Sequence, residues 1–248
     1  MGVKGVVLAG GTGSRLSPLT KVTNKHLLPI YDEPMIYYPL RMLVDAGISD
    51  IMVVTGGNSA GDFLKLLGNG EEFGLQQMQY GYQKGAGGIA EALGLTRYFV
   101  GDDDVVVVLG DNLLEHSIAG AVDRFREQGG GARVLLKQVH DPERFGVAEI
   151  EDSRIARIVE KPAEPRSDLA VIGVYMYDNS VFSFIEGLAP SERGELEITD
   201  VNNAYLARGD LRHEVIDGWW TDAGTFESLH HASKLVHQSR FGENAETA

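Results

Sequence analysis

The sequence predicts an α/β fold in which helices cover both faces of a mostly parallel sheet. Apolar runs rich in β-branched residues alternate with helical patterns over the first 140 residues, which is typical of parallel strands joined by crossover helices. A glycine-rich loop follows the first strand directly. The chain has 248 residues and 43% hydrophobic content, without a repeat or a low-complexity linker, so we expect one domain.

The first part of the chain supplies the predicted parallel strands and their helices. The uninterrupted apolar run Val3–Ala9 predicts a buried strand. A helix is expected over 34–46, with Pro34 in its first turn and Gly47 after its end. The same reasoning predicts strands at 50–55, 77–82, 104–109 and 132–139, and helices at 60–67, 89–99 and 117–128. The three glycines at 129–131 end the last of these helices.

The pattern changes near residue 140, where strands begin to follow one another. Segments 146–150 and 154–160 flank Glu151-Asp152-Ser153, a turn-forming sequence that predicts a hairpin. We expect further strands at 170–177 and 211–216, and helices at 179–187, 197–207 and 224–239. Residues 140–217 are therefore predicted to form a smaller β-rich insertion, and 242–248 a frayed tail.

The charge of the chain excludes several classes of partner. Its formal net charge is −14, which disfavours non-specific nucleic-acid binding and docking on an anionic membrane. Cysteine is absent, so disulfides and thiolate chemistry are excluded. No apolar run is long enough for a membrane span, and Gly10-Gly11 interrupts the first one too early for a signal peptide. We expect an unexported, cytoplasmic protein. The charged residues before Asp32 are all basic: Lys4, Arg15, Lys21 and Lys25.

The loop Gly10-Gly11-Thr12-Gly13-Ser14-Arg15-Leu16 is a candidate polyphosphate site. Glycines allow backbone N–H groups to approach phosphate closely. The dinucleotide fingerprint would need a glycine at Leu16, and the P-loop would need a Gly-Lys-Ser/Thr sequence, so neither standard motif is present. Arg15 offers a forked donor, and Lys25 a mobile charge ten residues later. Together they favour phosphate binding over a simple tight turn.

Two further sites follow predicted strands. Asp111 stands at the carboxyl end of strand 104–109, where it could hold Mg²⁺ or cap a helix. Asp222 makes a metal pair possible if the two carboxylates meet. Pro162 biases Lys161 towards an extended conformation at a strand end, which suits either a phosphate contact or a surface turn. Glu160 and Lys161 could touch one ligand only if the strand bends there.

Seven segments extend these sites into a family resemblance. In chain order they are Gly10-Gly11-Thr12-Gly13-Ser14-Arg15-Leu16, Asn24-Lys25-His26-Leu27-Leu28-Pro29-Ile30, Pro34-Met35-Ile36-Tyr37-Tyr38, Leu109-Gly110-Asp111-Asn112, Asp141-Pro142-Glu143-Arg144-Phe145-Gly146-Val147, Glu160-Lys161-Pro162 and Arg193-Gly194-Glu195-Leu196-Glu197-Ile198-Thr199. The sequence resembles the glucose-1-phosphate thymidylyltransferases from residue 3 to about the last helix. The resemblance implies a single-domain, Rossmann-like nucleotidyltransferase fold over 1–241, in which 140–217 forms much of the sugar side.

The resemblance also implies an activity and a set of site residues. The family transfers a thymidylyl group from dTTP to glucose 1-phosphate and releases pyrophosphate, with Mg²⁺, which would match Asp111 and Asp222. Catalytic roles would fall to Arg15, Lys25 and Lys161. The nucleotide would contact Leu8, Gly10, Gly11, Thr12, Gly13, Ser14, Gln83, Gly88 and Asp111. The sugar phosphate would contact Gly146, Glu160, Lys161, Val171 and Arg193. A homotetramer is the oligomeric state that the resemblance implies.

The sequence departs from the family pattern in three places. Gln83-Lys84-Gly85-Ala86-Gly87-Gly88 replaces a proline-rich segment, so uridylyl transfer from UTP stays open as an alternative. A non-catalytic nucleotide-sugar regulator is a second alternative, which the intact basic and acidic residues disfavour. The chain is a short form without the C-terminal extension that helps longer relatives form an effector site, so the resemblance does not extend to feedback inhibition by a dTDP-sugar product. Ile172 stands where relatives often have Thr, which predicts one polar group fewer in the sugar site.

Some motifs have simpler explanations. Gly57-Asn58-Ser59-Ala60-Gly61 matches the G-x-S-x-G of hydrolases, but such a short match arises easily by chance in a glycine-rich chain. We expect His230 and His237 at the surface, and Trp219 and Trp220 in the core or at an interface. Glu195 and Glu197 are expected to supply negative charge at a helix start.

Overall fold

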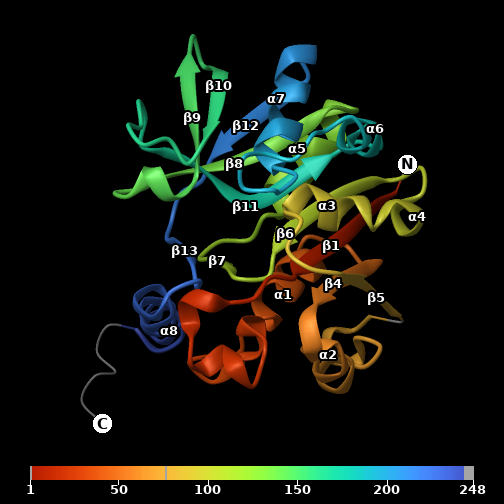
Figure 1. The fold of residues 1–248 in the computed structure, drawn as a ribbon, viewed down its shortest axis with the longest axis vertical. Helices are drawn as coiled ribbons and strands as arrows, with labels where there is room; N and C mark the ends of the chain where they lie inside the picture. Colours follow the sequence, from red (N-terminus) through yellow and green to blue (C-terminus); the bar gives the residue numbers. More distant parts are fainter. Residues whose placement is uncertain (1, 76, 243–248) are drawn as a thin grey trace.

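A mixed sheet crosses the middle of the computed structural model, with helices on both faces (Figure 1). The structure describes residues 2–75 and 77–242, so most of the expected frayed tail lies outside the described residues. Across the main path of the sheet the strands are β10 (Arg154–Glu160), β9 (Gly146–Glu151), β11 (Leu169–Tyr177), β6 (Asp104–Leu109), β1 (Val3–Ala9), β4 (Ile51–Gly56) and β5 (Met78–Gln83). β8 (Ala132–Gln138) pairs with β11, and β12 (Leu211–Val215) pairs with β8.

The sheet is parallel on one side and mixed on the other, which confirms the predicted fold class. β1 runs parallel to both β4 and β6, and β4 runs parallel to β5. β11 is antiparallel to β6, β8 and β9. The carboxyl ends of the parallel strands therefore meet at one edge, beside the antiparallel part built from the insertion.

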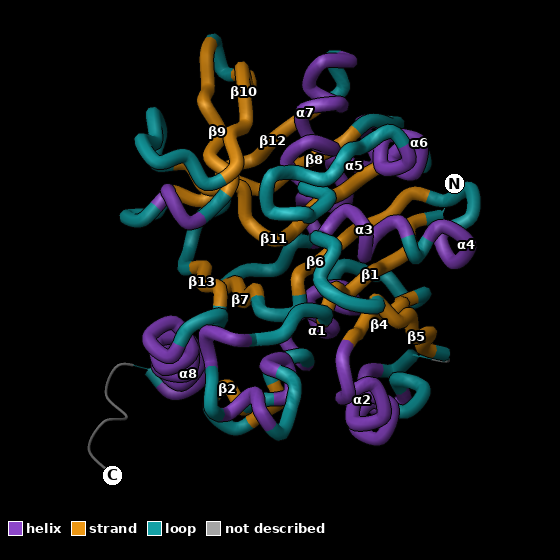
Figure 2. The backbone as a smooth tube through the Cα atoms, viewed as in Figure 1, coloured by secondary structure: helices purple, strands orange, loops and turns teal. Residues whose placement is uncertain are grey.

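The helices divide between two cores, one on each face of the sheet (Figure 2). Side chains alternate along β1: Val6 and Leu8 face one core, and Val7 and Ala9 the other. The first core is covered by α3 (Ile89–Gly94), α4 (Arg97–Val100), α6 (Val181–Glu186) and α7 (Ile198–Arg208). The second is covered by α1 (Tyr37–Asp45), α2 (Ala60–Leu67) and α5 (Ala119–Gln128). α8 (Phe226–Phe241) packs on a smaller third cluster.

Two predicted helices have different bounds in the structure. The helix expected over 34–46 begins at Tyr37, because Pro34 belongs to β3 (Glu33–Pro34), which pairs with β2 (Pro29–Ile30). The helix expected over 89–99 is two helices, since α3 ends at Gly94 and α4 begins three residues later. Between them Thr96 donates its hydroxyl to the carbonyl of Leu93 at 2.7 Å, and such a local bond competes with helical hydrogen bonding.

Two short strands that the sequence did not predict join distant parts of the chain. β7 (Asn112–Leu114) and β13 (Trp220–Asp222) form an antiparallel ladder that sets Asn112 opposite Asp222. Three residues are too few for an alternating pattern to be recognised. The predicted hairpin is confirmed as β9 and β10, and Asp152 and Ser153 of its turn have φ values of 47° and 62°.

Candidate active site

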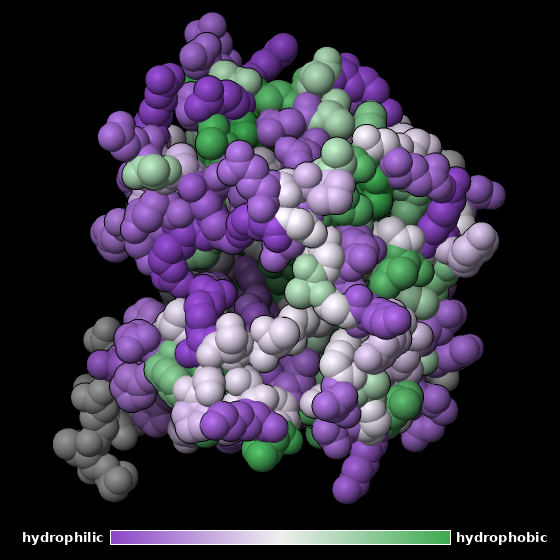
Figure 3. Space-filling view, viewed as in Figure 1, coloured by the Kyte–Doolittle hydropathy of each residue, from purple (hydrophilic) through white to green (hydrophobic). Residues whose placement is uncertain are grey.

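A cleft opens where the parallel strands end and the insertion begins. The space-filling view shows it as a hollow near the centre of one face, with hydrophilic side chains on its rim (Figure 3). Most predicted site residues line it: Leu8, Gly10, Gly11, Arg15, Lys25, Gln83, Gly88, Asp111, Gly146, Glu160, Lys161, Val171, Arg193 and Asp222. Thr12, Gly13 and Ser14 are not among the residues that line the cleft, so nucleotide contacts from that part of the loop stay a prediction.

Gly13 and Leu16 determine the shape of the glycine loop. Gly13 has φ 60°, and its carbonyl accepts bonds from Leu16 N and the Thr20 hydroxyl, both at 2.9 Å. This bonding explains why Gly13 shapes the loop instead of lining the cleft. Leu16 is fully buried and anchors the turn η1 (Ser14–Leu16), which leaves Arg15 exposed at the cleft. The loop therefore offers backbone and one accessible guanidinium to a ligand.

Lys25 and Asp111 form an ion pair in the floor of the cleft. Lys25 begins the short turn η3 (Lys25–Leu27), which is capped because the side chain of Asn24 accepts a bond from His26 N at 2.9 Å. The Lys25 ammonium donates to Asp111 Oδ2. Burial opposes ionisation of Asp111, but the charge of Lys25, the neighbouring His26 and the hydrogen bonds from Lys25 and Asn112 together outweigh it and hold the pKa of this carboxyl well below its usual range. Burial and Lys25 lower the pKa of His26 to about 3, so the imidazole is neutral.

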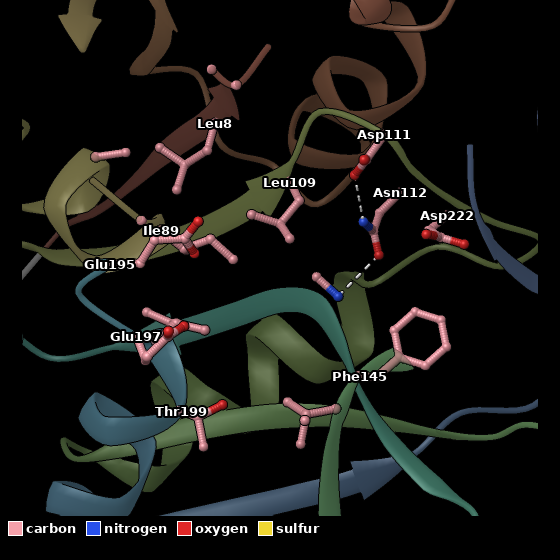
Figure 4. A pocket seen from close by; sticks show the side chains of 18 of the residues that line it. Leu8, Ile89, Leu109, Asp111, Asn112, Phe145, Glu195, Glu197, Thr199 and Asp222 are labelled. Carbon is pink, nitrogen blue, oxygen red and sulfur yellow. Dashed lines mark hydrogen bonds between the residues drawn. The ribbon is translucent and has the colours of Figure 1, made fainter. Parts of the chain in front are cut away.

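Asn112 orients Asp111 and is a functional residue that sequence reasoning did not assign. Its Nδ2 donates to Asp111 Oδ1 at 3.0 Å, and its Oδ1 accepts from Gly173 N at 2.9 Å (Figure 4). The same oxygen accepts from Trp220 Nε1 at 2.8 Å. A Cβ at Gly173 would lie 2.6 Å from Asn112 Nδ2, so glycine is required there. The signal available in the sequence was its adjacency to Asp111.

Asp222 meets Asp111 through the β7–β13 ladder. Ala223 N donates to the carbonyl of Asp111 at 2.8 Å, and Figure 4 shows both carboxylates on the same wall of the cleft. Burial, followed by the charge of Asp111, raises the pKa of Asp222 to about 6. Arg144, a second residue that sequence reasoning left without a role, donates to both oxygens of Asp222 at 3.2 Å. No helix begins at Asp111, so the helix-cap alternative is wrong.

The two carboxylates have the donor chemistry of a Mg²⁺ site. Mg²⁺ is usually held by one or two carboxylates together with substrate phosphates and water. Asp111 and Asp222 are each in contact with a protein cation, Lys25 and Arg144 respectively, as expected of carboxylates that attract positive charge. Among the described residues no group of three His, Cys, Asp or Glu side chains could hold a metal. This pair fits a metal shared with a ligand.

On the insertion side, a bend at Lys161 brings Glu160 and Lys161 to the same cleft. Lys161 has φ 42°, a left-handed conformation, so the expectation of an extended residue before Pro162 is wrong. Its backbone N–H donates to the carbonyl of Phe145 at 2.9 Å, which holds the bend against the start of β9. Thr199 donates its hydroxyl to Glu160 Oε2 at 2.5 Å. The strand bend on which the shared site depended is therefore present.

Arg193 is surrounded by carboxylates. Its Nη2 lies 2.7 Å from Glu197 Oε2, 3.2 Å from Glu160 Oε1 and 3.8 Å from Glu195 Oε2. Glu197 precedes α7, yet its side chain makes no bond to the helix start; it accepts instead from Ser191 and Arg193. Glu197 thus lies at the helix start as expected, but its side chain is bonded within this network at the rim of the insertion.

Other sequence features fall outside the cleft or have packing roles. Ile172 is fully buried in the second core, so its side chain does not remove a polar group from the cleft. The G-x-S-x-G segment lies between β4 and α2 and does not line the cleft. Trp219 packs on the third core, as predicted, whereas Trp220 packs on the second core and also lines the cleft beside Phe145. His237 contacts the ring of Tyr31.

One end of the cleft is formed where β5 passes into α3. Gln83 is 4% exposed, and its amide nitrogen donates to the carbonyl of Gly88 at 3.1 Å. Gly88 has φ 99°, and a Cβ there would lie 2.4 Å from the carbonyl oxygen of Leu196. The segment that carries Gln83 and Gly88 therefore packs closely against the backbone of Leu196, on the opposite side of the cleft.

Comparison with known proteins places this site in a class. The model of the nucleotidyl transferase family matches residues 4–239. A glucose-1-phosphate thymidylyltransferase of Neisseria meningitidis serogroup A is 46% identical over 94% of this chain and 82% of its own. A Bacillus anthracis protein assigned as a glucose-1-phosphate thymidylyltransferase, solved with a sucrose, is 55% identical with a TM-score of 0.91, covering 94% of this chain and 95% of that one.

A UDP-glucose pyrophosphorylase solved with UDP-glucose is more distant, at 25% identity and a TM-score of 0.84 over 97% of this chain and all of its own. The fold is that of a nucleotidyltransferase. Within that class, the chain belongs to the glucose-1-phosphate thymidylyltransferase family. Among the described residues, no helix is both long and apolar enough to cross a membrane.

Proposed function

We propose that the protein transfers a thymidylyl group from dTTP to glucose 1-phosphate, giving dTDP-glucose and pyrophosphate. The observation that carries the proposal is that one cleft brings together Arg15, Lys25, Asp111, Lys161 and Asp222. These residues come from distant parts of the chain and supply cations for phosphate groups and carboxylates for a metal. The identity to thymidylyltransferases supports the choice of nucleotide and sugar.

The nucleotide side holds the triphosphate. Gly10 and Gly11 present backbone to it without a Cβ in the way. Arg15, exposed at the rim, would contact the β- and γ-phosphates with its forked donors. Lys25 would stabilise the charge that develops on pyrophosphate as it leaves. Leu8, Gln83 and Gly88 would contact the nucleoside.

Asp111 and Asp222 would hold Mg²⁺ on the phosphate oxygens. When bound, the ion supplies positive charge that reduces the repulsion between two anionic substrates. Asn112 keeps Asp111 oriented by the bond at 3.0 Å. Lys25 and Arg144, which contact these carboxylates in the structure, are then available to phosphate oxygens.

The sugar side holds glucose 1-phosphate and aims it. Lys161 would bind the phosphate, and Glu160, fixed by Thr199, would accept hydrogen bonds from sugar hydroxyls. Gly146 and Val171 lie beside it in the cleft wall, and Arg193 closes the rim. A phosphate monoester is already ionised at neutral pH, so its oxygen can attack the α-phosphorus in line without a general base. Orientation and charge neutralisation are the main contributions of the protein.

One assay tests the proposal. The protein is incubated with MgCl₂, glucose 1-phosphate and each nucleoside triphosphate separately, and pyrophosphate is measured. We expect release with dTTP, and none with dTTP when glucose 1-phosphate is omitted. Equal rates with UTP and dTTP would contradict strict thymidylyl transfer. No release of pyrophosphate with any nucleotide would contradict the proposed enzymatic activity. Size-exclusion chromatography with light scattering tests the homotetramer that family resemblance implies.

A further inference from the structure

Glu91, in the first turn of α3, lies behind Gln83 and outside the set of residues that line the cleft. The amide nitrogen of Gln83 donates to Glu91 Oε2 at 2.6 Å and to the carbonyl of Gly88 at 3.1 Å. An ionised carboxylate and a backbone carbonyl can only accept. Both N–H groups of the Gln83 amide are therefore used, and the orientation of this amide follows from its partners.

The other end of the amide faces the loop after β1. A Cβ placed on Gly10 would lie 2.8 Å from Gln83 Oε1, so the bare Cα of Gly10 makes room for this oxygen. None of the described residues donates a hydrogen bond to Oε1. The surrounding cleft wall is largely apolar, with Leu8, Ala86 and Ile89. Apolar walls with one directed acceptor suit the flat face and polar edge of a nucleobase that carries an N–H.

We infer that Glu91 is a positioning residue for base selection, which makes the nucleotide site take keto pyrimidines and reject cytosine. The inference rests on the proposed function, in which Gln83 faces the base. Thymine and uracil carry a hydrogen on N3 that can be donated to Gln83 Oε1. Cytosine presents a lone pair at N3. A flipped amide would suit cytosine but would turn Oε1 towards Glu91 and the Gly88 carbonyl, both acceptors.

The backbone around Glu91 holds its carboxylate in place. A Cβ on Gly87 would lie 2.2 Å from Glu91 Oε2, so the carboxylate packs directly on that glycine. Gly87 accepts a bond from Leu196 N at 2.8 Å, and Ala90 N donates to the Leu196 carbonyl at 3.2 Å. These bonds fix the segment against the opposite rim. Glu91 thus has a defined position from which to orient Gln83.

The test compares dTTP with 5-methyl-dCTP, which differ only in the exocyclic group at position 4 and the hydrogen on N3. The ratio of their kcat/KM values is measured for the wild type, Glu91→Met and Glu91→Gln. Glu227→Met, an exposed glutamate on α8, is the matched control. We expect a wild-type ratio of at least about 100, because a buried polar group left unpaired costs that much or more. Glu91→Met should lower the ratio about tenfold or more, and Glu91→Gln should lie between, since its side-chain oxygen can still accept.

Each ratio comes from one preparation, so a smaller folded fraction lowers both rates and cancels. An unchanged ratio in Glu91→Met, with dTTP turnover intact in the wild type, would overturn the inference and leave the proposed function standing. Absence of turnover in the wild type would instead contradict the proposed function. In that event calorimetry of dTTP and 5-methyl-dCTP binding still tests base selection. Equal dissociation constants for the two nucleotides in the wild type would overturn the role of Glu91.

Discussion

The two sides of the cleft hold their charges in different ways. On the proposed nucleotide side Arg15 is exposed on a short turn, and none of the ion pairs among the described residues includes it. On the proposed sugar side Arg193 lies among three carboxylates, and Glu160 is bonded to Thr199. Apart from the Lys25–Asp111 ion pair, the proposed nucleotide side thus offers backbone and a free cation, whereas the proposed sugar side is a prearranged side-chain network. Substitutions should act locally on the first side and spread through the network on the second.

The largest effect is expected where the two sides meet. Asp111→Asn removes the charge of a carboxylate that pairs with Lys25 and lies beside Asp222. We expect turnover to fall by about 1000-fold or more, since metal charge at the reacting phosphates contributes several kcal/mol. Asp62→Asn, on the exposed face of α2, is the control. Binding of Mn²⁺, followed by electron paramagnetic resonance, should weaken in Asp111→Asn alone; unchanged binding would show that the metal lies elsewhere.

A reciprocal pair of variants separates the two sides. Lys161→Ala should raise the KM for glucose 1-phosphate by about 10- to 100-fold and change that for dTTP little, because one charged hydrogen-bond donor to a phosphate is lost. Arg15→Ala should do the reverse, with a larger effect on nucleotide and turnover. Steady-state kinetics with each substrate varied in turn measures both. If Lys161→Ala impaired dTTP more than the sugar phosphate, Lys161 would belong to the nucleotide side.

A smaller effect tests whether the sugar side behaves as a network. Thr199→Val keeps the shape of the side chain but removes the hydroxyl that donates to Glu160 at 2.5 Å. We expect the KM for glucose 1-phosphate to rise about three- to tenfold, because Glu160 loses the bond that orients it. The KM for dTTP should be unchanged, and a parallel rise in both would mean that Thr199 supports the whole cleft.

The sequence predicted the parallel half of the sheet and most of the cleft, because both depend on short-range signals. Val3–Ala9 is followed by glycines, and Asp111 follows an apolar strand, so each could be placed at the sheet edge from its neighbours. The meeting of Asp111 and Asp222 could not be derived, since the ladder that joins them is three residues long and spans the chain. The bend at Lys161 could not be predicted either, because a residue before a proline is biased towards extended conformations. In the structure Lys161 has φ 42°.

The smallest effect on catalysis is expected from substitution of Asp178, which follows β11 and does not line the cleft. Its carboxylate accepts from Gly131 N and from the Tyr205 hydroxyl, both at 2.7 Å. Burial opposes ionisation, but these bonds and Ser180 outweigh it and lower the pKa of Asp178. Asp178→Asn should reduce the free energy of unfolding by about 1–3 kcal/mol at pH 7 and leave the KM values unchanged.

The pH dependence of this effect has a definite sign. A carboxyl whose pKa is lowered by folding stabilises the protein above its unfolded pKa of about 3.9 and loses that contribution as the pH falls through the folded pKa. Urea unfolding at a series of pH values should therefore show the difference between wild type and Asp178→Asn shrinking below about pH 4. A difference that grew on acidification would contradict the assigned bonds.

The central claim is that the sugar-phosphate oxygen, held on one side of the cleft, displaces pyrophosphate directly from a nucleotide held on the other. Its most direct test uses a single diastereomer of dTTP in which sulfur replaces one non-bridging oxygen on the α-phosphorus, together with glucose 1-phosphate and MgCl₂. The configuration of the product is read by ³¹P nuclear magnetic resonance. One in-line displacement predicts inversion at that phosphorus. Retention would require a covalent nucleotidyl–enzyme intermediate and would contradict the account.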